Sequence, residues 1–168
     1  IGGNDFAGIY QLFGAGTLIQ SNYIGINAAG TMDVGNQQYG VFIDTTVDGV
    51  VGVTATVVGN VISGNDLDGV FFGFSDSGVV QGNLIGTNAA GTLAIGNSRH
   101  GVEIGFGSSN TMIGGTNAGE GNVIAFNGGQ GVLIRNTSTK SNPVLGNSIY
   151  SNTGLGIELS NGNSADGV

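Results

Sequence analysis

A six-residue pattern, Asn-x-Ile-x-x-Asn, recurs five times and constrains the fold of this chain more than any other feature. The copies begin at Asn22, Asn60, Asn83, Asn122 and Asn147. In each copy an Asn and an Ile stand two residues apart, so both side chains point to the same side of an extended strand. A unit that recurs every 20 to 50 residues or so is typical of a repeat protein. The pattern therefore predicts short strands stacked on one another.

Two further apolar patterns accompany each copy. One is a glycine followed by three residues whose first and third members are apolar, and it starts at Gly8, Gly40, Gly69, Gly101, Gly131 and Gly156. The middle residue varies from Phe to Glu, so we expect it to face outward while its neighbours face inward. The first copy departs from this rule because Gln11 stands where an inward apolar residue is expected. The other pattern is an apolar pair: Leu18-Ile19, Val57-Val58, Val79-Val80, Met112-Ile113 and Val144-Leu145.

The constant order of these three patterns predicts the fold class. Three short strands for every 25 to 32 residues describe a coil that closes on itself and stacks on the next one. We therefore expect an all-β solenoid of about five coils that forms one domain over residues 1–168. Coils one and three carry long excursions after the Asn pattern, at residues 28–38 and 89–100, because residues 21–43 resemble residues 82–104.

The asparagines are expected to form a structural ladder. A side-chain amide carries a donor and an acceptor, so stacked Asn residues can bond to the coils above and below and also satisfy the backbone where the coil bends. The first column is predicted to contain Asn22, Asn60, Asn83, Asn122 and Asn147. The second is predicted to contain Asn27, Asn65, Asn88, Asn127 and Asn152.

Composition excludes several classes of partner. Three basic residues against eleven acidic ones give a net charge of −8, which disfavours nucleic acid and anionic membrane surfaces. The absence of cysteine excludes a disulfide framework and thiolate metal sites. The apolar runs are far shorter than the roughly 20 residues that span a bilayer. We expect no nucleic acid, no membrane insertion, no cofactor and no metal site.

These patterns resemble those of a known group of proteins. The Asn-x-Ile-x-x-Asn and Gly-Val-x-Ile units are similar to the repeats of the pectate-lyase-like superfamily, particularly the glycine-rich type of large secreted bacterial surface proteins. The resemblance covers residues 4–159. It implies a right-handed parallel β-helix and an extracellular or cell-surface location. For function it leaves lyases, hydrolases, epimerases, adhesins and structural solenoids open.

Candidate catalytic and metal residues are few. Asp66 and Asp68 are two residues apart and could form a carboxylate pair, but a solvated turn is the simpler interpretation. Asp44, Asp48 and Asp76 could join Asp66 and Asp68 as calcium ligands, although no calcium-binding loop motif is present. Arg99-His100-Gly101 resembles the His-Gly element of polygalacturonases, yet the other motifs of those enzymes are missing. The sequence thus predicts no catalytic residue, with His100 in an exposed turn, and the basic residues are only Arg99, Arg135 and Lys140.

An outward stripe is the remaining candidate for binding. It contains Tyr10, Phe42, Phe71 and Leu133, with Glu103 and Glu158 in the same column. Exposed apolar patches usually mark a contact surface, so contact with another protein is the first interpretation, and glycan binding and cover by a loop are the alternatives.

The expected function is that of a non-catalytic structural or adhesive solenoid in a secreted surface protein or extracellular filament. Both ends of the sequence lie within a repeat, so we expect end-to-end self-association or flanking β-helix coils. The alternatives are a polysaccharide-active enzyme (a lyase, hydrolase or epimerase) and a glycan-binding module.

Overall fold

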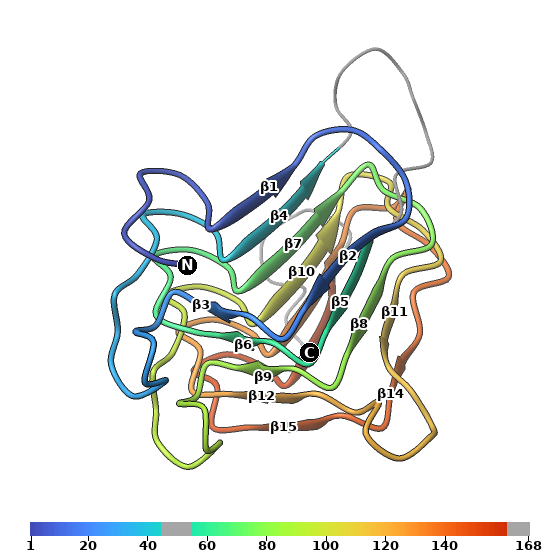
Figure 1. Cartoon of the computed structure of the whole chain (residues 1–168). Helices are drawn as coiled ribbons and strands as arrows, with labels where there is room; N and C mark the ends of the chain where they lie inside the picture. Colours follow the sequence, from blue (N-terminus) through green and yellow to red (C-terminus); the bar gives the residue numbers. More distant parts are fainter. Residues whose placement is uncertain (45–54, 161–168) are drawn as a thin grey trace.

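The computed structural model describes residues 1–44 and 55–160, and these residues form a stack of coils with a β-sheet on each of three faces (Figure 1). Each coil contributes one strand to each sheet, in the order sheet A, sheet B, sheet C. Every pairing between named strands in these sheets is parallel, because each strand pairs with its counterpart one coil away. The predicted β-helix of about five coils is therefore confirmed.

Sheet A is built from the Gly-Val-x-Ile units. Its strands, in spatial order, are β1 (Ile9–Gln11), β4 (Val41–Asp44), β7 (Val70–Gly73), β10 (Val102–Gly105), β13 (Val132–Arg135) and β16 (Ile157–Ser160). The register aligns the first residue of each unit with that of the next, so Val70 pairs with Val102. Like residues therefore stack in columns along the sheet.

Sheets B and C hold the apolar pairs and the Asn patterns. The strands of sheet B are β2 (Thr17–Gln20), β5 (Ala55–Val58), β8 (Val79–Gln81), β11 (Met112–Gly114) and β14 (Val144–Leu145). The strands of sheet C are β3 (Tyr23–Ile24), β6 (Val61–Ile62), β9 (Leu84–Ile85), β12 (Val123–Ala125) and β15 (Ser148–Tyr150). The strands are short because the coil turns after each one.

The core lies inside the coils and is made of columns of β-branched residues and Phe72. Ile62, Ile85 and Ile124 are stacked in register and have no exposed surface. β-Branched side chains suit this position because they pack well on a pleated surface. Gln11 is buried as well, and its amide donates to the carbonyl oxygen of Gly14 at 3.0 Å.

The first Asn column is continuous. Each residue of the column except the last, Asn147, donates from its backbone N–H and its side-chain amide to Oδ1 of the next member. The side-chain amides of Asn60 and Asn83 also donate to carbonyl oxygens of sheet B, at Ile19 and Val57. The column thus satisfies the backbone at the bend between sheets B and C.

The second Asn column differs from the expected one. Asn36 and Asn97 occupy the places assigned to Asn27 and Asn88, and the column is Asn4, Asn36, Asn65, Asn97, Asn127 and Asn152. The long excursions postpone the bend, so the Asn that follows the excursion enters the column. Oδ1 of Asn27 and of Asn88 instead accepts hydrogen bonds from backbone N–H groups within its own excursion.

The two excursions touch each other. The N–H of Ala89 donates to the carbonyl oxygen of Gly30 at 2.9 Å. The sequence places the excursions on coils one and three, about two coils apart, and this contact shows that they lie closer together than that. In residues 1–44 and 55–160, no helix is long and apolar enough to cross a bilayer. End-to-end association stays a prediction.

Candidate functional site

The outward column of sheet A passes from aromatic to charged residues. Tyr10, Phe42, Phe71, Glu103, Leu133 and Glu158 are paired in register along six strands. Their exposure is uneven, however. Tyr10 is 47% exposed and Phe42 is half-buried, whereas Phe71 and Leu133 are buried. The predicted contact stripe of Tyr10, Phe42, Phe71 and Leu133 is therefore not a continuous open surface.

Aromatic rings from the turns cover part of this column. Tyr39 stacks on Phe42 with ring centroids 4.6 Å apart, and Phe42 stacks on Phe71 at 4.9 Å. Phe106 approaches Phe71 at 6.0 Å. Together they line a cavity of about 310 Å³ whose wall consists of Tyr39, Phe42, Asp44, Phe71, Phe74, Phe106 and Arg135.

Phe74 and Phe106 reach the cavity through an unusual backbone conformation. Their φ angles are +52° and +53°, and each follows a glycine at the end of a strand of sheet A. Left-handed backbone costs a non-glycine residue roughly 1–2 kcal/mol, and glycine is the usual choice there. The rings stack on each other with centroids 5.4 Å apart. Two phenylalanines thus occupy turn positions where the backbone alone favours glycine.

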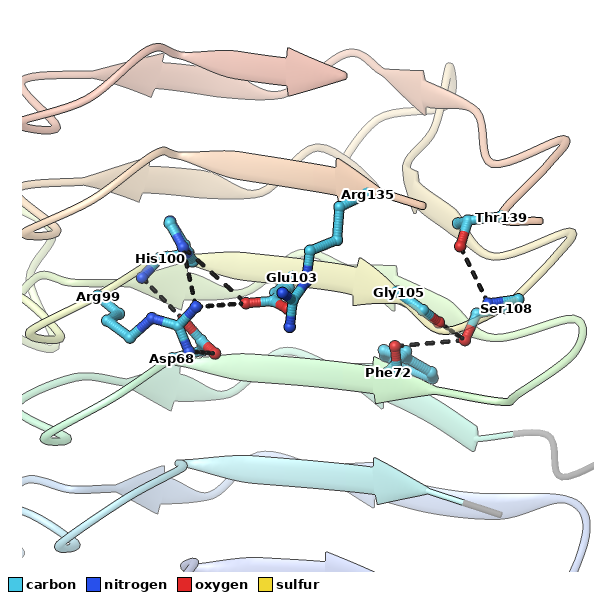
Figure 2. A network of polar contacts seen from close by, with 10 residues as sticks. Asp68, Phe72, Arg99, His100, Glu103, Gly105, Ser108, Arg135 and Thr139 are labelled. Carbon is cyan, nitrogen blue, oxygen red and sulfur yellow. Dashed lines mark hydrogen bonds and ion pairs between the residues drawn. The ribbon is translucent and has the colours of Figure 1, made fainter. Parts of the chain in front are cut away.

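A group of charged residues adjoins the cavity, on the same face of sheet A (Figure 2). Oδ1 of Asp68 accepts a hydrogen bond from the backbone N–H of His100 at 2.9 Å, and its Oδ2 lies 3.4 Å from Nη1 of Arg99. Nη2 of Arg99 lies 3.1 Å from Oε2 of Glu103. Nε of Arg135, from the next coil, lies 2.5 Å from Oε1 of Glu103, although this contact lacks hydrogen-bond geometry. We call these five residues the charged cluster.

The carboxylates of the charged cluster are buried, contrary to the sequence analysis. The side chains of Asp68 and Glu103 have no exposed surface, whereas those of Arg99 and Arg135 are 39% and 32% exposed. His100 is also buried, so its expected place in an exposed turn is wrong. The guanidinium groups of Arg99 and Arg135 supply the counter-charge that two buried carboxylates need.

Burial and charge shift two pKa values in opposite directions. Burial, followed by the negative charge of Glu103, raises the pKa of Asp68 from 3.8 to about 7. Burial, followed by the positive charges of Arg99 and Arg135, lowers the pKa of His100 from 6.5 to about 4. The imidazole is therefore neutral at pH 7. Its Nδ1 accepts a hydrogen bond from the N–H of Gln130 at 3.0 Å.

The chemistry available to the charged cluster is limited by access. General acid and base groups must come within hydrogen-bond reach of the reacting bond. Asp68 and Glu103 are covered, and neither lines the aromatic cavity. The arrangement therefore suits fixing Arg135, whose guanidinium carbon lies 4.9 Å from the centre of the Phe106 ring and which forms part of the cavity wall.

The other candidate residues do not come together. Asp66 is exposed while Asp68 is buried, because the segment is a turn in which residues two apart do not share a face. Asp44 lines the cavity, Asp76 accepts hydrogen bonds from Ser109 and Asn110, and Asp48 lies outside the described residues. Among the described residues, the one group with metal-ligand spacing is Asp68, His100 and Glu103, which does not include Asp44 or Asp76. Lys140 is exposed and forms an isolated parallel bridge with Ser109.

Some of these residues could have been found from the sequence. Glu103 stands between Phe71 and Leu133 in the outward column, and a charged residue between two apolar neighbours marks an exception. Arg135 stands two residues after Leu133 and therefore projects from the same side of its strand. Phe74 and Phe106 share the position after a strand-ending glycine. The depth of burial had no signal in the sequence.

The fold and this face define a class of protein, a right-handed parallel β-helix with an aromatic cavity and a charged cluster on sheet A. Comparison with protein families assigns it further. The family described as "Periplasmic copper-binding protein (NosD)" matches residues 3–166, so the chain belongs to this family. No curated protein and no solved structure matches the chain significantly.

The family supports a location outside the cytoplasm. Its description is periplasmic, which agrees with the cell envelope in general and does not single out the cell surface. The resemblance to pectate-lyase-like β-helix repeats is confirmed by the family and the three parallel sheets.

Proposed function

We propose that this chain is a non-catalytic β-helix of the cell envelope that binds carbohydrate on the outer face of sheet A. The observation that carries the proposal is the cavity of about 310 Å³ with five aromatic side chains in its wall. A volume near 300 Å³ is at the lower end for small-ligand pockets, which combine apolar walls with a few polar groups. Such a cavity suits one or two sugar rings.

The chemistry of the wall supports this ligand class. Aromatic faces accept the apolar face of a sugar ring, while a carboxylate and a guanidinium supply the acceptor and donors that hydroxyl groups need. Both groups are present in the wall, the carboxylate on Asp44 and the guanidinium on Arg135. Arg135 is held on one side by Glu103 and on another by Phe106, so its position is fixed before a ligand binds.

Protein contact is the weaker interpretation of this face. A protein partner needs an extended open surface of roughly 800 Å² on each side. Phe71 and Leu133, two of the four residues of the expected stripe, are 4% and 8% exposed. A concave aromatic site is therefore better suited to a small ligand.

A glycan array followed by calorimetry tests the carbohydrate proposal. The purified chain is expected to bind a limited set of oligosaccharides, and Phe106→Gly is expected to lower the affinity about tenfold, or about 1.4 kcal/mol. Phe126→Gly is a matched control, since Phe126 also has a positive φ, of 62°, but contacts Tyr150 away from the cavity. Equal loss in both variants, or no loss in either, would remove the cavity from the proposal.

A further inference from the structure

We infer that Arg99 and Arg135 take the place of a metal ion in the Asp68–His100–Glu103 group, so that this chain holds no copper there. The three residues have the spacing of a metal site, and the description of the chain's family names copper. Its hydrogen bonds, tautomer and charge nevertheless fit a cluster closed by guanidinium groups.

The supply of copper ligands in the chain is poor. Proteins bind copper mainly through imidazole, thiolate and thioether groups. The sequence has one histidine, no cysteine and two methionines. Met32 is 65% exposed on the first excursion, and Met112 lies on β11 of sheet B, whereas the charged cluster is on sheet A. A copper ion at His100 would therefore have only carboxylates as further side-chain ligands.

Both carboxylates are already paired. Oε2 of Glu103 lies 3.1 Å from Arg99 and Oε1 lies 2.5 Å from Arg135, so a guanidinium group stands at each oxygen. Oδ1 of Asp68 accepts the N–H of His100 and its Oδ2 faces Arg99. An incoming cation would have to displace two positively charged side chains to reach these oxygens.

The tautomer of His100 is also unsuitable. Neutral imidazole has one nitrogen with a lone pair and one that carries the proton. Nδ1 accepts the N–H of Gln130 at 3.0 Å, so Nε2 carries the proton. Nε2 is the nitrogen on the side of the carboxylates, 3.9 Å from Oε2 of Glu103. Binding of a metal at Nε2 would require the proton to move to Nδ1, which would break the hydrogen bond from Gln130 and bring the ion beside Nη2 of Arg99, 3.4 Å from Nε2.

Charge leads to the same result. Two buried carboxylates and two guanidinium groups surround a neutral imidazole. A divalent ion would add two positive charges beside the guanidinium groups or displace them from their partners, and either change is unfavourable in a buried site. Without an ion, each carboxylate has a guanidinium group beside it, and the cluster holds Arg135 at the wall of the aromatic cavity.

Nitrogen NMR on the unaltered chain tests the inference without any variant. His100, as the single histidine, gives one pair of imidazole ¹⁵N signals. At pH 7 we expect the pattern of the Nε2–H tautomer, unchanged by one equivalent of Zn²⁺. A shift of Nε2 to the metal-bound range, saturating at one equivalent, overturns the inference.

Copper titration followed by electron paramagnetic resonance gives a second readout. Any Cu²⁺ bound by the chain is expected to show oxygen ligation from exposed carboxylates and to bind equally to His100→Gln. One equivalent of Cu²⁺ bound by the unaltered chain with histidine nitrogen coupling, and lost in His100→Gln that circular dichroism shows to be folded, contradicts it.

Discussion

Asn83 donates to Oδ1 of Asn122 twice, from its backbone N–H at 3.0 Å and from its side-chain amide at 2.9 Å. The same double contact links every successive pair of the first column. It ties one coil to the next at the bend between sheets B and C. The stability of the helix should therefore depend on these amides.

Replacement of Asn83 by Leu is expected to lower the free energy of unfolding by about 1–3 kcal/mol. Leucine has a similar volume, but it leaves the backbone N–H of Asn60 without its acceptor and the carbonyl oxygen of Val57 without the side-chain donor, and it removes one of the two donors to Oδ1 of Asn122. Denaturant unfolding measures the change. Asn22→Leu is the matched control, since Asn22 stands at the end of the column and is half-buried. Equal losses in the two variants would show that the ladder does not act through burial.

Asn97 and Asn88, near the two ends of the second excursion, should differ in how much they contribute to the free energy of unfolding. Asn97 is a buried member of the second column, whereas Asn88 bonds within its own excursion. We expect Asn97→Ala to cost about 1–3 kcal/mol and Asn88→Ala to cost less. Hydrogen exchange should locate the effect of Asn88→Ala in residues 88–96. A larger global loss for Asn88→Ala than for Asn97→Ala would contradict the observed column.

These two positions show how far the sequence predicts the fold. The repeats established the three strands per coil and the pairing of like residues, since a stacked coil has few other registers. They did not distinguish Asn88 from Asn97, because both precede a bend and the length of the excursion decides which one enters the column. Local pattern was informative wherever the coil is regular.

The candidate site was harder to predict. Glu103 and Asp68 are acidic residues in a chain of net charge −8, and exposure is the ordinary expectation for such residues. Their burial depends on Arg99 and Arg135, which come from a turn and from the next coil. These ion pairs join residues about 30 positions apart in the sequence. They can be predicted only when the register between neighbouring coils is known.

The charged cluster should respond asymmetrically to substitution. Glu103→Leu places an apolar residue between Phe71 and Leu133, and because the two arginines that it releases are partly exposed, we expect it to cost less than about 3 kcal/mol. Replacing both Arg99 and Arg135 by Gln leaves two buried carboxylates uncompensated, which should cost about 3–5 kcal/mol. Thermal or denaturant unfolding at pH 7 compares them. A double Gln variant as stable as the parent would show that the arginines do not neutralise the cluster.

The pH dependence of stability should separate Asp68 from His100. The folded pKa of His100 is about 4 against 6.5 for an ordinary histidine, so its contribution is present above pH 6.5 and is lost as the pH falls toward 4. The folded pKa of Asp68 is about 7 against 3.8, so its contribution is present below pH 3.8 and is lost as the pH rises toward 7. The two slopes oppose each other in the parent chain.

Single substitutions reveal each slope. Asp68→Asn should leave a chain whose unfolding free energy falls as the pH decreases from about 6.5 to 4. His100→Gln should leave one whose unfolding free energy falls as the pH increases from about 4 to 7. Urea unfolding at a series of pH values measures both. Slopes of the same sign in the two variants would contradict the opposite shifts.

We propose that the aromatic cavity on sheet A binds carbohydrate without cleaving it. NMR spectra recorded while the chain is titrated with its tightest-binding oligosaccharide test this proposal. We predict saturable shifts at Tyr39, Phe42, Phe106 and Arg135, and an oligosaccharide that remains intact in the same tube. Shifts confined to sheets B and C, or the appearance of new reducing or unsaturated ends, would contradict the account.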